Sequence, residues 1–109
     1  MATAYKVLGQ SAPSATTATA LYTVPSATEA VVSSVTVCNR AGTAGSFRLS
    51  VRPDGATLAN EHYVVYDTAI AANDTVILTI GLTLDAADVL EVYASSADMS
   101  FNAYGSEIS

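Results

Sequence analysis

The sequence predicts an all-β domain, a seven- to eight-stranded antiparallel β-sandwich of jelly-roll-like form with an extended N-terminal arm. Small apolar and β-branched residues alternate with Ser and Thr at a period of two over most of the chain. Clusters of Gly, Pro, Asn and Asp interrupt these stretches at short intervals, which is typical of turns between short strands. The length of 109 residues fits one domain.

The N-terminal part, residues 1–20, is predicted to be a strand followed by an extended arm. The strand covers residues 5–8. Residues 9–19 are rich in Ser, Ala and Thr and contain Pro13, a composition that favours a loop or an extended segment. The β-sandwich domain itself is expected over residues 21–109.

Three strands are predicted in the first half of that domain. Residues 21–24 form a short strand that ends at Pro25. Residues 30–39 form the next, with Val31, Val35 and Val37 expected on one face. Residues 46–52 alternate most regularly and lead into a Pro-Asp-Gly turn at 53–55.

The second half contains four more predicted strands, after a loop or helical turn at 58–61. They cover residues 62–66, 75–82, 89–94 and 99–104. In the second of these, the alternating apolar residues are expected to share one face; they are Val76, Leu78, Ile80 and Leu82. Turns are expected at 85–88 and 95–98 because Asp, Ser and Ala cluster there.

The charge composition disfavours two classes of partner and favours association with other protein surfaces. Four basic and ten acidic residues give a net charge of −6, which disfavours nucleic acid and anionic membranes. Charged residues make up 13% of the chain, about half the usual share of a globular domain. Because a surface with few charges is poorly protected against association, we expect part of it to be covered by copies of itself or by a larger assembly.

The residues capable of acid–base chemistry are too few to predict an enzyme. His62 is the single histidine, and no Gly-x-Ser-x-Gly motif accompanies it. Cys38 is the single cysteine, lies in an apolar strand and is expected to act as a small hydrophobic residue. Asp85 and Asp88 lack the spacing of a calcium loop and are expected to stabilise a turn. We therefore expect no catalytic residues, no metal site and no cofactor.

The aromatic residues are the candidate interaction residues. The chain has six tyrosines, two phenylalanines and no tryptophan. A tyrosine ring packs while its hydroxyl stays in water, which suits a half-buried contact. The candidate interface residues are Tyr5, Tyr22, Tyr63, Tyr66, Tyr93 and Tyr104. A row of exposed rings would instead indicate a carbohydrate-binding surface, and this alternative stays open.

Five segments lie between residues 5 and 108; they are Tyr-Lys-Val-Leu-Gly-Gln at 5–10, Leu-Tyr-Thr-Val-Pro at 21–25, Val-Thr-Val-Cys-Asn-Arg at 35–40, Phe-Arg-Leu-Ser-Val-Arg at 47–52 and Ser-Phe-Asn-Ala-Tyr-Gly-Ser-Glu-Ile at 100–108. In their order and in the length of the chain, they resemble small virion structural proteins of tailed bacteriophages, in particular those of cyanophages.

The resemblance implies a capsid decoration (cement) protein that binds the outer capsid surface and stabilises contacts between major capsid subunits. Its partners would be the major capsid protein and itself, as a homotrimer, with residues 1–19 reaching across neighbours. It would be synthesised in the cytoplasm of the bacterial host, because the N-terminus lacks the basic start and apolar stretch of a signal peptide. A tail, baseplate or fibre-attachment adaptor is the alternative placement in the particle.

Overall fold

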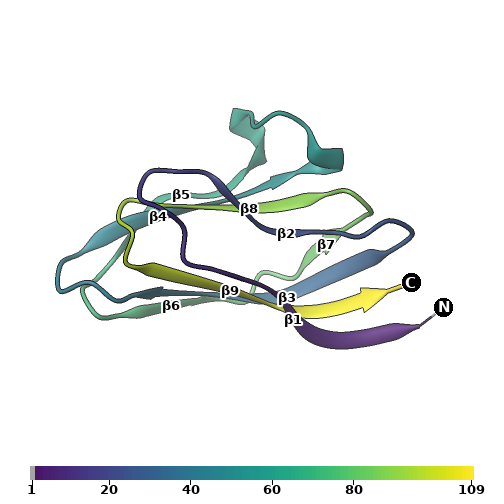
Figure 1. The fold of residues 1–109 in the computed structure, drawn as a ribbon, viewed down its shortest axis with the longest axis horizontal. Coiled ribbons are helices and arrows are strands. Elements are labelled where there is room, and N and C mark those ends of the chain that lie inside the picture. The colour runs from purple at the N-terminus through teal and green to yellow at the C-terminus, as the bar shows by residue number, and fades with distance from the viewer. Residues whose placement is uncertain (1) are drawn as a thin grey trace.

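The computed structural model describes residues 2–109 as two antiparallel sheets that face each other (Figure 1). The prediction of an all-β fold is confirmed. The described residues form nine strands and two single-turn 3-10 helices, in the order β1 (Thr3–Ser11), β2 (Thr19–Thr23), β3 (Glu29–Asn39), β4 (Gly45–Arg52), η1 (Pro53–Gly55), η2 (Asn60–His62), β5 (Tyr63–Ile70), β6 (Thr75–Leu78), β7 (Leu82–Leu84), β8 (Val89–Ala94) and β9 (Met99–Ile108). Neither helix is long enough to cross a membrane.

The two sheets differ in their strands but share one core. Sheet A has the order β1-β9-β3-β6, with β7 also paired to β3, and sheet B has the order β2-β8-β4-β5. Phe47 of sheet B and Phe101 of sheet A are fully buried and meet edge to face, with ring centroids 6.3 Å apart. Burying each large apolar side chain contributes about 1.5–3 kcal/mol, so this shared core stabilises the fold.

A β-bulge in β3 changes which of its valines lie on the same face, compared with the prediction. The register with β9 shifts between Val32 and Ser34, so one extra residue interrupts the alternation. As a result Val32, Val35 and Val37 are fully buried together, while Val31 is only partly buried. The prediction that Val31 shares a face with Val35 and Val37 is wrong, because one added residue reverses the side on which later residues lie.

A matching bulge in β1 lies on the other side of β9. The β1–β9 register shifts between Val7 and Gly9, next to Tyr104. The two bulges therefore flank the same stretch of β9, where the strands come unusually close. A Cβ atom added to Gly105 would lie 1.9 Å from the Val31 carbonyl oxygen. Only glycine allows this approach of β3 and β9.

The N-terminal segment is more ordered than the sequence suggested. β1 runs from Thr3 to Ser11 and pairs with β9, so the strand predicted at residues 5–8 is longer. In the crossover to β2, Pro13 is buried and the Thr16 amide donates to the Ala94 carbonyl at 2.8 Å. Within the described residues the segment predicted as an arm thus packs on its own domain. Met1 lies outside the described residues.

Two further strand boundaries differ from the prediction. The strand predicted at 75–82 is two strands, β6 and β7, because Gly81 adopts φ +56° between them. Val76, Leu78 and Leu82 pack against the core as expected, whereas Ile80 is 37% exposed. The strand predicted at 62–66 is β5 and continues to Ile70, since its second half pairs with β4.

Candidate interaction site

The outer face of sheet B is organised around one arginine. The Arg48 guanidinium carbon lies 4.3 Å from the ring centroid of Tyr66 and 4.2 Å from that of Tyr93. Arg48 Nε donates to Asp67 Oδ1 at 2.6 Å, and Nη2 donates to Oδ2 at 3.3 Å. The hydrogen bonds to Asp67 raise the pKa of the guanidinium above its ordinary value. This cation is therefore held by two rings and a carboxylate of its own chain.

A bulge in β5 creates this arrangement. Phe47 pairs with Thr68 and Leu49 pairs with Val65, which leaves both Tyr66 and Asp67 opposite Arg48. Asp67 has φ 49°, in the left-handed region that Asp tolerates better than most residues. The extra residue therefore lets a ring and a carboxylate reach the same guanidinium.

A second ion pair lies next to this cluster, beneath the segment 53–62. Arg52 Nη2 is 3.4 Å from Glu91 Oε1, and Arg52 Nη1 donates to the carbonyls of Gly55 and Ala56. Arg52 Nε and Glu91 Oε2 are buried without a protein partner. The arginine thus fastens the turn after β4 to the sheet.

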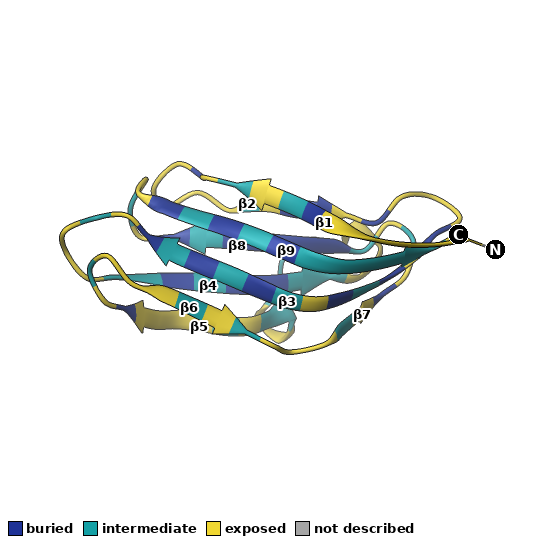
Figure 2. Ribbon diagram, turned by 90° about the horizontal axis from the view of Figure 1, so that it is seen from below, coloured by how far each residue is buried: buried dark blue, intermediate teal, exposed yellow. Residues whose placement is uncertain are grey.

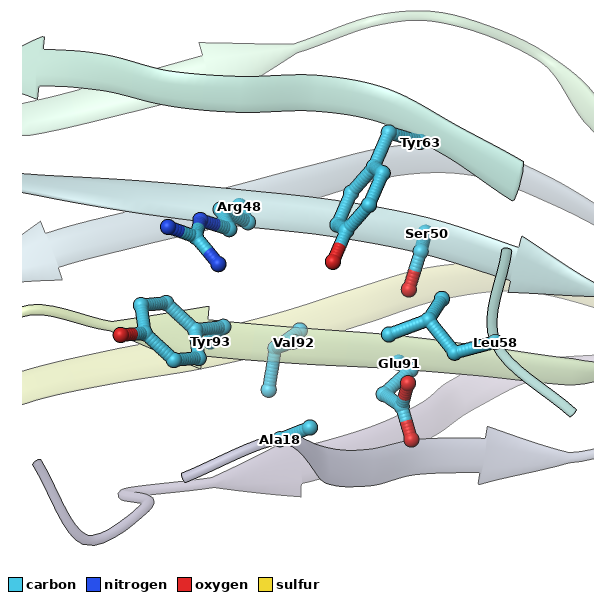
Figure 3. A pocket seen from close by; sticks show the side chains of 8 residues that line it. All are labelled: Ala18, Arg48, Ser50, Leu58, Tyr63, Glu91, Val92 and Tyr93. Atoms are coloured by element: carbon cyan, nitrogen blue, oxygen red, sulfur yellow. The ribbon is translucent and has the colours of Figure 1, made fainter. Parts of the chain in front are cut away.

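Figure 3 shows the side chains that line a cavity under this segment. The cavity is too small for an organic ligand. Its volume of about 20 Å³ is close to the space that one water molecule requires. Its lining residues come from β4, β5, β8 and the adjoining loops; they are Ala18, Arg48, Ser50, Leu58, Tyr63, Glu91, Val92 and Tyr93. The outer face of sheet B is therefore largely satisfied by its own side chains.

The outer face of sheet A, hereafter face A, has a different composition. Its outward positions follow from the strand register and from the buried residues that alternate with them. These positions on four strands are Tyr5, Val7, Gln10, Val31, Ser34, Thr36, Cys38, Ile77, Ser100, Asn102, Tyr104 and Ser106. Glu29 lies at one end of the face and Arg40, bound to Ser100 Oγ at 2.9 Å, at the other. No charged residue occupies the outward positions between these two ends in the described chain.

Face A exposes apolar side chains that have no partner within the domain. Tyr5 is 85% exposed, Ile77 67% and Val7 47%. An open hollow of about 380 Å³ lies around Gly105, between Tyr5 and Tyr104, and it is also lined by Lys6, which is paired with Glu107. Figure 2 shows the underlying sheet, with buried and partly buried residues alternating along β9 and β3. Such a surface can pack against another protein without burying an ion.

The two sheets are joined near the chain termini by a polar bridge. The Tyr22 hydroxyl of β2 donates to Glu107 Oε2 at 2.5 Å, and Lys6 Nζ lies 2.9 Å from Glu107 Oε1. The hydrogen bonds from Tyr22 and then from Lys6 lower the pKa of Glu107. Burial and the neighbouring Glu107 raise the pKa of Tyr22. Tyr22 therefore stays neutral and Glu107 stays ionised at neutral pH.

The six tyrosines fall into three groups. The rings on sheet B lie around Arg48, and Tyr63 and Tyr66 meet edge to face with centroids 4.8 Å apart. Tyr5 and Tyr104 lie on face A. Tyr22 is 7% exposed and belongs to the core, so the isolated domain does not offer it to a partner.

The remaining candidates have local structural roles. His62 Nδ1 accepts a hydrogen bond from the Ala59 amide at 3.0 Å. Cys38 is partly exposed on face A, rather than buried as expected, because the bulge and the alternation of β3 turn it outward. Asp88 accepts hydrogen bonds from the amides of Asp54 and Asp85, which confirms the turn interpretation of that acidic pair.

The Arg48–Asp67 pair was missed by the sequence reasoning. The one signal was the proximity of Asp67 to two tyrosines, but the bulge that brings it opposite Arg48 has no sequence marker. Among residues 2–109, no three His, Cys, Asp or Glu side chains lie close enough to hold a metal ion.

Comparison with protein-family models, curated proteins and solved structures finds no match to this chain.

Proposed function

We propose that this chain is a structural protein of a phage particle, a capsid decoration (cement) protein that binds the outer capsid surface through face A. The placement in a virion rests on the resemblance of its segments, from residue 5 to residue 108, to small phage virion proteins. The binding mode rests on one observation. Among the described residues, the outward positions of face A carry no charge between its two ends, and the face exposes Tyr5, Val7 and Ile77.

The size of face A suits a protein interface. The strands that form it, β1, β3, β9, β6 and β7, have 9, 11, 10, 4 and 3 residues. At about 4.8 Å between strands and roughly 3.3 Å per residue, they cover on the order of 600 Å². A standard interface buries about 800 Å² per partner, so face A with its rim approaches this value. Because the outward positions between its ends carry no charge in the described residues, docking there removes few ions of this chain from water.

Binding of this kind stabilises a shell by repetition. A domain that lies across two capsid subunits adds buried area to their contact, and many copies repeat the gain over the lattice. A tail, baseplate or fibre-attachment adaptor would use the same face, and the copy number per particle separates the two placements.

The carbohydrate-binding alternative receives less support. Sugars stack on flat, exposed aromatic rings, whereas the rings of Tyr63 and Tyr66 stand at 84° to each other. Arg48 also covers Tyr66 and Tyr93. The tyrosines of sheet B therefore do not form an open row.

The test measures binding to phage shells that lack this protein. Thr36→Glu places a charge at the centre of face A, and Ala69→Glu places the same charge at an exposed position of β5 in sheet B. We expect the wild type and Ala69→Glu to bind and to raise the temperature at which shells rupture, and Thr36→Glu to lose both effects. Equal binding of the two variants would contradict the role of face A, and absence of wild-type binding to shells and tails would contradict the proposed function.

A further inference from the structure

One sheet edge in the structure is left open for pairing. In residues 2–109, β2 has five residues and a register shift, β5 has two register shifts, and the edge made by β6 and β7 is broken at Gly81. Such interruptions prevent the addition of another strand. β1 is different, because Thr3–Val7 pairs with β9 in an unbroken register.

The hydrogen bonds at the end of the sheet show which groups of β1 face outward. Ala2 and Ser109 exchange both backbone hydrogen bonds, at 2.6 and 2.9 Å. In an antiparallel pair such residues alternate with residues whose amide and carbonyl point away from the partner strand. Ala4 and Lys6 therefore bond to β9, whereas Thr3, Tyr5 and Val7 present their amides and carbonyls outward.

This outward edge is exposed along its whole length. Residues 3–7 are all exposed, and they lie toward the end of the molecule that carries the chain termini (Figure 2). Tyr5, in the middle, is the most exposed large apolar side chain described, at 85%. An unpaired edge with exposed apolar residues is a template for a further strand.

We propose that β1 pairs antiparallel with β1 of a second copy of this chain, about a two-fold axis at Tyr5. Thr3 then pairs with the partner's Val7, Tyr5 with the partner's Tyr5, and Val7 with the partner's Thr3. These three pairs supply about six backbone hydrogen bonds, since both residues of each pair present outward groups. The two Tyr5 rings become cross-strand neighbours.

The charges favour this register over its neighbours. With the axis at Tyr5, Lys6 lies opposite the partner's Ala4. An axis at Lys6 would place two lysines directly opposite each other, which is destabilising, and would leave only two hydrogen-bonded pairs. An axis at Ala4 likewise leaves two such pairs among the described residues. The register at Tyr5 therefore satisfies the most backbone groups without opposing like charges.

This pairing goes beyond the proposed function, because it concerns the free protein and does not depend on a capsid. It closes after two copies, since each β1 has one open edge. It thus gives a dimer in place of the trimer expected from the phage resemblance, and it continues sheet A across both copies.

A cysteine cross-link tests the register. Tyr5→Cys in a Cys38→Ala background places two cysteines in a hydrogen-bonded pair with Cα atoms about 5.5 Å apart, within the range of a disulfide. Lys6→Cys in the same background is the control, because diagonal neighbours lie about 7–8 Å apart. We expect a covalent dimer from Tyr5→Cys under mild oxidation and little from Lys6→Cys. Equal cross-linking of both variants would overturn the register.

Light scattering at micromolar concentration tests the association itself. We expect the wild type to be a dimer. Tyr5→Lys should be a monomer, because it places two lysines opposite each other at the axis. Ile77→Lys introduces a lysine on β6 instead and should remain a dimer. Both positions are exposed, so melting temperatures should confirm folding. A wild-type monomer or trimer would overturn the dimer. Shell binding is scored separately: a dimer without shell affinity contradicts only the proposed function, and a monomer with shell affinity contradicts only this inference.

Discussion

The outer faces of the two sheets belong to one domain but have opposite chemistry. On sheet B, Arg48 pairs with Asp67 and Arg52 pairs with Glu91, and the segment 53–62 covers part of the surface. In residues 2–109, face A has no charged residue at the outward positions between its ends, and Tyr5, Val7 and Ile77 stay exposed on it. The ion pairs of sheet B thus hold their charges against one another, whereas the outward positions of face A between its two ends are neutral in the described residues.

All four basic residues form an ion pair or hydrogen bonds with groups of their own chain. Lys6 binds Glu107, and Arg40 binds Ser100 and the carbonyl of Ala97, in addition to the two arginines on sheet B. A cation already held by its own chain contributes little to a partner. Charge content alone therefore underestimates how neutral part of a surface can be.

The largest effect is expected from Gly105→Ala, which acts on the sheet that carries face A. The added Cβ would collide with the Val31 carbonyl oxygen, so β3 and β9 would have to separate. We expect a loss of about 3 kcal/mol in the free energy of unfolding, measured by urea denaturation. Gly42→Ala is the control, since its Cβ would have no neighbour within 4 Å. Similar values for the two variants would refute the close approach.

Arg48→Met should disturb the outer face of sheet B and leave face A intact. It removes the ion pair with Asp67 and the guanidinium between two rings. We expect a lower melting temperature and a changed near-ultraviolet signal from the tyrosines, with a smaller drop than for Gly105→Ala. Arg40→Met, which removes hydrogen bonds but no ring contacts, should change the melting temperature less. The reverse order would contradict the role of the cluster.

Tyr22→Phe should weaken the bridge between the sheets in a pH-dependent way. Glu107 has a pKa below its ordinary 4.5, so its contribution is complete above that pH and is lost as pH falls through the lowered value. Tyr22 has a pKa above its ordinary 10.0, so its contribution is complete below that pH and declines at higher pH.

The stability difference between wild type and Tyr22→Phe should therefore be greatest between pH 5 and pH 9, roughly the plateau between those two limits. It should shrink toward pH 3. Denaturant titrations across this range measure it, and a difference independent of pH would show that the hydroxyl does not act through Glu107.

The smallest effect is expected from Ile77→Thr on face A. Its side chain is 67% exposed and should change stability by less than about 0.5 kcal/mol. Leu58→Thr, at the cavity over sheet B, should cost about 1 kcal/mol, because Leu58 packs over the outer face. If Ile77→Thr lowered the melting temperature more than Leu58→Thr, Ile77 would have to pack against its own domain, which would contradict the exposure of face A.

The elements that obey a strict period of two could be predicted from the sequence, and the others could not. β4 appears where the alternation placed it, because inward residues such as Leu49 meet the core in an unbroken register with β8. β3 was located correctly but its faces were not, since the bulge at Ser33 leaves no mark in the residue pattern. Tyr66 and Tyr93 could be recognised from the sequence as contact residues, but their contact with Arg48 could not.

The sequence by itself determined the all-β class, most strand positions and the shortage of charge, because alternation and composition are local properties that each residue carries with it. Only the tertiary structure decided where the charges lie, which sheet face is neutral and which edge is open. Those features depend on the pairing of strands distant in the chain, and a single inserted residue at Leu8, Ser33 or Asp67 changes what meets across a sheet.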